Sequence, residues 1–311
     1  MNKDKLFGNI PMNNIQDLEQ LNQFDVTWLN DPAISNKSSY SIIPPEGNIV
    51  DDGRVEYIFN SDGFRSDKFK KNHDGKLHIL FAGCSETEGV GSPLNTCWAK
   101  MFYDRIAHVN ETSGYFNIGK AGWGFQKITR AVVQYVDKYG APEYLFLLHP
   151  NLGRLVEWDE DLKIYVQNQY FTHSHAVDER KNKNNKSHEL HLLSEKKEKD
   201  IFISFVYQMN LFEAYCKSNN IKLIWTTWEI DDDMENIGKM KHLFPSFFEL
   251  PDERGLTEFI QRDRPNGKFR VDDLKRRDGH SGILKCKWWG NAFANEAIRK
   301  GLNVHPNFFV D

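Results

Sequence analysis

Short apolar runs alternate along the chain with longer segments in which apolar residues recur every three or four positions. The apolar runs lie at residues 77–82, 115–118, 144–148 and 221–226. The segments with helical spacing lie at residues 98–109, 125–139, 201–217 and 282–300. Continuous apolar runs are typical of strands buried on both faces, and their alternation with helices predicts an α/β fold with a parallel sheet.

The stretch before residue 75 has a different character. We expect residues 1–74 to form an irregular extension packed on the core. A short amphipathic helix is predicted at residues 15–24, and short strands are predicted at residues 40–43 and 55–59, on either side of turn-rich Pro/Gly and Asp/Gly segments.

Residues 75–311 are then expected to form the main domain. Inside it, residues 178–200 are rich in Lys, Asn and Glu and predict a polar, mobile insertion. A second long connection spans residues 231–272. Long connections at the carboxyl edge of a sheet are where substrate selectivity tends to lie.

Composition narrows the possible functions. With 40% hydrophobic residues and a net charge of -4, the chain is globular and lacks the basic field that nucleic acid or an anionic membrane would require. No apolar run reaches the roughly 18 residues of a membrane span, and the first residues lack the apolar core of a signal peptide. We therefore expect a cytoplasmic protein that contacts neither nucleic acid nor membrane; its Asn/Lys-rich composition would also suit a phage particle.

The metal-binding residue types do not form a convincing site. The four cysteines are scattered and predict reduced thiols rather than a disulfide framework or zinc site; they are Cys84, Cys97, Cys216 and Cys286. Two histidine pairs lie in or beside the polar insertion, where solvated loop histidines are commoner than ligands. We expect neither a metal nor an organic cofactor.

Ser85 is the strongest candidate for chemistry. It follows the apolar run that ends near Gly83, so it should lie at the carboxyl edge of the sheet, where open α/β folds place their sites. Far downstream, Asp278 and His280 are two residues apart. A serine hydroxyl needs a base, and neutral imidazole titrates near working pH. In an extended segment residues i and i+2 point the same way, so Asp278 can orient the His280 ring.

Four separated segments resemble, in the expected order, the SGNH hydrolases, also called GDSL esterases/lipases. They are GCSETEG at 83–89 continuing into NTCW at 95–98, NIGKAGWG at 117–124, LLHPN at 147–151, and DGH at 278–280. Upstream, NSDGFR at 60–65 is similar to a segment that often precedes the nucleophile in one branch of that family. The resemblance covers about residues 54 to 301. It implies a three-layer α/β/α flavodoxin-like parallel sheet of the SGNH hydrolase type.

The chain departs from the family pattern in three places. Cys84 replaces the usual aspartate of the first segment. Pro150 precedes Asn151 where glycine is common, and no aspartate follows. The acid and the base are separated by two positions instead of the commoner three.

The resemblance implies a serine esterase with a Ser85, His280 and Asp278 triad. An oxyanion formed on the substrate needs preorganised donors, and the candidates are the backbone N–H groups of Ser85 and Gly122 and the side-chain amide of Asn151. Glycine at 122 would let the backbone approach the substrate. The family resemblance points to short acyl groups, and O-acetyl removal from a glycan is the first substrate hypothesis.

Simpler interpretations exist for each residue alone. Ser85 could be a helix N-cap, Asp278 and His280 part of a turn, and Asn151 a loop cap. Trp123 and His149 could line the substrate site or pack in the core. Two other functions also remain open: an acyltransferase on the same fold, in which a sugar hydroxyl replaces water, and a non-enzymatic binding or virion structural protein. The sequence leaves the oligomeric state undetermined.

Overall fold

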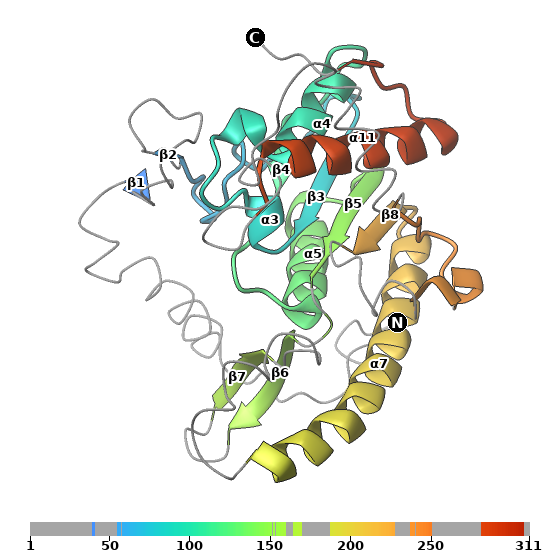
Figure 1. The fold of residues 1–311 in the computed structure, drawn as a ribbon. Helices are drawn as coiled ribbons and strands as arrows, with labels where there is room; N and C mark the ends of the chain where they lie inside the picture. The colour runs from blue at the N-terminus through green and yellow to red at the C-terminus, as the bar shows by residue number, and fades with distance from the viewer. Residues whose placement is uncertain are drawn as a thin grey trace, which may run out of the picture.

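Four parallel strands form the central sheet of the computed structural model (Figure 1). The structure describes residues 39–40, 55–56, 58–150, 152, 154–159, 164–169, 187–227, 237–239, 241–250 and 281–307. The sheet strands are β3 (Ile79–Gly83), β4 (Phe116–Asn117), β5 (Tyr144–His149) and β8 (Lys222–Thr227). Their spatial order is β4-β3-β5-β8, and every neighbouring pair is parallel.

The register aligns the carboxyl ends of the two central strands. Gly83, the last residue of β3, lies beside Leu148 of β5, and Leu148 lies beside Thr226 of β8. The segments that follow these strands therefore leave the sheet at one common edge, which is the edge that carries the candidate chemistry.

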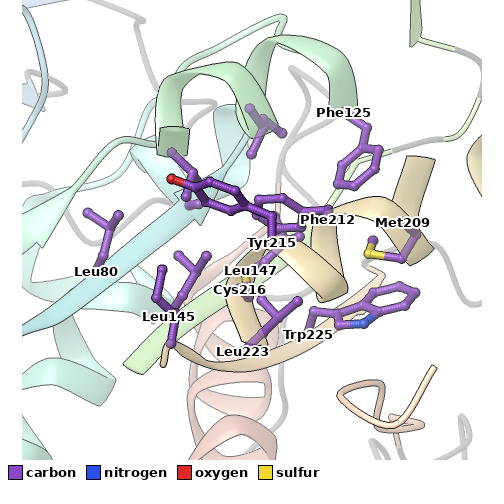
Figure 2. Packing of buried hydrophobic residues seen from close by; sticks show 14 of the residues in the cluster. Leu80, Phe125, Leu145, Leu147, Met209, Phe212, Tyr215, Cys216, Leu223 and Trp225 are labelled. Carbon is purple, nitrogen blue, oxygen red and sulfur yellow. The ribbon is translucent and has the colours of Figure 1, made fainter. Parts of the chain in front are cut away.

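One face of the sheet is covered by α5 (Phe125–Tyr139) and α7 (Ser187–Ser218). Leu145 and Leu147 of β5 point to this face, because side chains alternate along a strand. Figure 2 shows Phe125, Met209 and Phe212 of the two helices packed over these leucines. The apolar spacing along α5 thus faces the sheet, as its sequence predicts.

The other face is covered by α4 (Trp98–Ala107) and α11 (Ile283–Arg299). Phe81 and Phe146, from alternate positions of β3 and β5, belong to this second cluster. The rings of Trp98 and Phe293 stack with their centroids 4.5 Å apart, which joins the two helices over the sheet. The arrangement is an α/β fold with helices on both faces of a parallel sheet.

The strands and helices predicted after residue 75 are confirmed, with shifts of one to three residues at most ends. Two features differ. Helix α7 begins at Ser187, so more than half of the expected insertion at 178–200 is helical, because Leu, Glu and Lys are strong helix formers. An unpredicted antiparallel hairpin follows β5, made of β6 (Arg154–Asp159) and β7 (Ile164–Gln169). Short turns complete the fold: α3 (Ser85–Glu88), η2 (Leu94–Thr96) and η3 (Lys241–Leu243).

In the amino-terminal stretch, β1 (Ser39–Tyr40) and β2 (Val55–Glu56) pair antiparallel, at the edges of the two predicted short strands. The helix predicted at residues 15–24 lies outside the described residues. No helix in the described part of the chain has the length and apolar character needed to cross a membrane.

Candidate active site

Ser85 is the first residue of the short helix α3, two positions after strand β3 ends. The turn between strand and helix is tight. A Cβ atom on Gly83 would lie 2.8 Å from the carbonyl oxygen of Leu148 and would also overlap Thr87. Only glycine therefore lets α3 pack directly on the strand ends.

The side chain of Ser85 is 6% exposed. Its Oγ lies 3.9 Å from Sγ of Cys84, the residue that replaces the family aspartate. Cys84 itself is completely buried. Sulfur is a weak hydrogen-bond acceptor. The Ser85 hydroxyl therefore has no strong acceptor among the described residues.

The second motif segment is fixed against the first by three hydrogen bonds. Lys120 N–H donates to the carbonyl of Gly83 at 3.2 Å. Asn117 Nδ2 donates to the carbonyl of Thr87 at 2.8 Å. Ala121 N–H donates to Oε2 of Glu88 at 2.6 Å. The structure thus brings residues 117–121 beside α3, although the bonded residues are 30 or more positions apart.

Gly122 continues this second segment at the surface. It is exposed, its φ is +79°, and a Cβ there would meet no atom within 4 Å. A non-glycine residue would be strained at this φ value. Glycine here therefore keeps an exposed backbone in the left-handed region next to α3.

The segment that directly follows the acid–base motif also contacts α3. Ser281 directly follows DGH at 278–280, and its backbone N–H lies 3.2 Å from Oε1 of Glu86. Ser281 Oγ donates to the same oxygen at 3.3 Å. Both residues are buried, with 4% and 6% of their surface exposed. Asp278, His280 and Asn151 themselves lie outside the described residues.

Arg65, from the upstream segment at 60–65, holds the chain that leaves α3. Arg65 is 1% exposed. Nη1 donates to the carbonyls of Gly89 at 2.8 Å and Ser92 at 2.9 Å. A stretch assigned from sequence to the extension is thus part of the scaffold behind Ser85.

His149 and Trp123 lie inside the apolar cluster between the sheet and its helices. The His149 ring is completely buried, with its centroid 4.8 Å from Phe125 and 4.9 Å from Phe205. Burial lowers the pKa of His149 to about 3, so the ring is neutral. Trp123 is 8% exposed and meets the Phe64 ring edge to face at 5.9 Å. His149 and Trp123 are therefore core residues.

Two residues of the site had no predicted role. Glu86 and Glu88 lie within the first motif segment at 83–89, and both carboxylates are buried and accept backbone N–H groups from other segments. Glu88 also lies 3.8 Å from Nζ of Lys120. The only signal in the sequence was two acidic residues in a segment that follows a buried strand.

The described residues contain no group of three or more His, Cys, Asp or Glu side chains able to hold a metal ion. Comparison of the chain with models of protein families and with curated protein sequences finds no match. The case for a function therefore depends on the geometry around α3 and on the motif order.

Proposed function

We propose that this protein is an SGNH-type serine esterase that removes short acyl groups, with O-acetyl esters of a carbohydrate as the first candidate substrates. The strand order supports the proposed fold type. Counted along the chain, the order β4-β3-β5-β8 corresponds to 2-1-3-4, which is the order of flavodoxin-like sheets. In such sheets ligands bind outside the carboxyl ends of the strands, the edge at which Ser85 lies.

The observation that carries the proposal is the hydrogen bond between Ser281 N–H and Glu86. Ser281 is covalently joined to His280, and Glu86 is joined to Ser85. Consecutive Cα atoms are about 3.8 Å apart. The hydrogen bond therefore supports the proposal that the segment with the base lies close to the nucleophile, although 195 positions separate Ser281 from Glu86.

In the proposed mechanism, Ser85 Oγ attacks the acyl carbon while His280 takes the hydroxyl proton. Asp278 orients the His280 ring and stabilises its charged form. The carbonyl oxygen becomes an oxyanion that accepts hydrogen bonds from the N–H groups of Ser85 and Gly122 and from the Asn151 amide. His280 then protonates the departing alcohol oxygen as the tetrahedral intermediate collapses to an acyl-serine.

In the second half, His280 takes a proton from water and the resulting hydroxide attacks the acyl-serine. Collapse returns the proton to Ser85 Oγ and releases the carboxylic acid. The exposed backbone at Gly122 supports its assignment as a donor, since a substrate can approach without meeting a side chain. Each oxyanion donor is expected to contribute on the order of 10²- to 10³-fold in rate.

The test combines a fluorophosphonate probe with acetate release from O-acetylated glycans. Wild type should be labelled and should release acetate, whereas Ser85→Ala should do neither. Ser113→Ala is a matched control, because Ser113 is buried at the amino-terminal end of the same sheet, where its N–H bonds to Leu77. Equal labelling or acetate release by wild type and Ser85→Ala would contradict the proposal. Product that forms only with an added sugar acceptor would indicate acyl transfer.

A further inference from the structure

Helix α3 carries two buried carboxylates besides the candidate nucleophile. Glu86 and Glu88 are 6% and 2% exposed. In an α-helix each residue turns about 100°, so residues two apart project to nearly opposite sides. The two carboxylates therefore leave the helix in opposite directions, and each reaches a different segment of the chain.

Glu88 reaches the segment that contains Gly122. Its Oε2 accepts the Ala121 N–H at 2.6 Å, one residue before Gly122. Its Oε1 lies 3.8 Å from Nζ of Lys120, which donates to the carbonyl of Gly63. A hydrogen bond to an ionised acceptor is shorter and stronger than a neutral one. Glu88 thus fixes the Ala121 backbone, which sets the direction of the following N–H group, that of Gly122.

Glu86 reaches the segment that follows DGH at 278–280. It accepts both the N–H and the hydroxyl of Ser281. Helix α11 begins two residues later, and the partial positive charge at its amino end favours a carboxylate there. Burial, followed by the nearby charge of Glu86, raises the pKa of the Cys286 thiol in the first turn of α11. Glu86 therefore joins α3 to the start of α11.

We propose that Glu86 and Glu88 are positioning residues of the esterase site, Glu86 for the base segment and Glu88 for the oxyanion loop. This inference rests on the proposed function, in which Ser85, His280 and Gly122 act together. Ser85 is the first residue of the same helix. This one turn of helix therefore positions the nucleophile relative to the base segment and to the oxyanion loop. In this role each carboxylate acts through the backbone N–H that it holds.

The inference predicts a specific pattern of kinetic effects. Removing either carboxylate leaves a backbone N–H without that acceptor, and the freed segment shifts. A displacement of about 1 Å lowers turnover on the order of 10²-fold in other enzymes. Glu86→Ala and Glu88→Ala should therefore lower kcat by about that factor, while KM stays near the wild-type value because groups that bind substrate are untouched.

Conservative variants separate positioning from general destabilisation. Glu86→Gln and Glu88→Gln keep an acceptor oxygen at the same distance, so they should recover most of the lost kcat. Glu86→Asp and Glu88→Asp keep the charge but shorten the side chain, so they should lower kcat by roughly tenfold, one free-energy step of about 1.4 kcal/mol. If an Ala variant does not fold, the Asp variant of the same residue provides the decision.

Glu213→Ala is the matched control. Glu213 also accepts a backbone N–H, from Ser246 at 3.2 Å, and an indole N–H from Trp225 at 3.0 Å, but it lies on α7. The Glu213→Ala substitution should lower the midpoint of unfolding without lowering kcat. Steady-state kinetics and probe labelling would be measured on each folded variant, as judged by circular dichroism.

Two failures are distinguishable in this experiment. If Ser85→Ala is as active as wild type, the esterase proposal itself is wrong. If Ser85→Ala is inactive but folded Glu86→Asp and Glu88→Asp turn over at the wild-type rate, only the positioning roles are overturned. A fall in kcat of Glu213→Ala equal to that of the α3 variants would likewise assign the effect to stability and overturn the inference.

Discussion

The side chain of Asn117 joins the end of strand β4 to helix α3, because its Nδ2 donates to the carbonyl of Thr87 at 2.8 Å. The same side chain accepts the N–H of Gly119 at 2.7 Å through Oδ1. Asn117 is 1% exposed, so water cannot replace either bond. One buried amide therefore holds both the helix that begins with Ser85 and the loop that leads to Gly122.

Asn117→Ala should destabilise the protein by roughly 2 to 4 kcal/mol, because it leaves two buried backbone groups without partners. Urea unfolding followed by circular dichroism would measure this difference. The control is Asn72→Ala: Asn72 is exposed and its Oδ1 accepts only the N–H of Asp74 at 2.9 Å. That change should stay within about 0.5 kcal/mol. Equal effects of the two substitutions would show that the Asn117 contacts contribute little.

Gly119 provides a test of the close packing between the loop and α3. A Cβ at this position would lie 2.7 Å from the Glu88 nitrogen and 2.8 Å from the Thr87 carbonyl carbon. Gly119→Ala must push these backbones apart, which typically costs about 1 to 3 kcal/mol. Because α3 begins with Ser85, the displacement should also slow fluorophosphonate labelling of that serine.

The control for this change is Gly63→Ala. Gly63 has a φ of +79° but no atom within 4 Å of its Cβ position. It should lose about 1 kcal/mol through backbone strain and keep the wild-type labelling rate. If Gly119→Ala labels as fast as Gly63→Ala, then the separation between the loop and α3 does not matter for the nucleophile.

The sheet and its helices could be predicted because their sequence patterns are local. Helix α5 was predicted with the observed bounds, since its apolar spacing is regular and Gly140 follows its last residue. Strands β3 and β5 are almost entirely apolar, and β8 has an apolar centre at Leu223, Ile224 and Trp225. The start of α7 was harder, because its first half is polar and its helical character depends on residue propensity instead of an apolar stripe.

The site could be predicted only in part, because its contacts join distant segments. The order of motifs suggested that Ser85 and Gly122 lie at one edge, and the structure brings the segments that carry them together. Motif spacing contains no information about which buried carboxylate meets which backbone N–H, so Glu86 and Glu88 were missed. His149 was a candidate for lining the substrate site, but the neighbours that bury it come from α5 and α7.

Substitution of Arg65 tests whether the segment at residues 60–65 is part of the scaffold behind Ser85. Arg65→Met removes the buried donor to the carbonyls of Gly89 and Ser92 and should cost roughly 3 kcal/mol. Arg65→Lys should recover only part of this, because an ammonium group lacks the planar set of donors. Arg299→Met is the control, since Arg299 is largely exposed and pairs with Glu296 at 2.6 Å. It should cost less than about 1 kcal/mol, and a loss as large as that of Arg65→Met would contradict the buried role.

The buried imidazole of His149 makes stability depend on pH. Burial lowers its pKa to about 3 in the folded protein, with the nearby charge of Arg154 as a smaller cause in the same direction. The pKa of histidine in an unfolded chain is about 6.5. The unfolded state therefore binds a proton between these two values and the folded state does not. Stability must fall as pH decreases from 6.5 toward 3, and it is unaffected above this window.

Lowering the pH from 7 to 4.5 should therefore remove about 2.5 kcal/mol of unfolding free energy through His149. His149→Phe removes this part of the loss, because a phenyl ring fits among Phe125, Phe205 and Trp225 and takes up no proton. Urea unfolding of both proteins at the two pH values measures the difference. His242→Phe, at an exposed position, is the matched substitution for comparison. If His149→Phe loses as much stability as wild type on acidification, the imidazole must reach solvent or a partner that stabilises its charge.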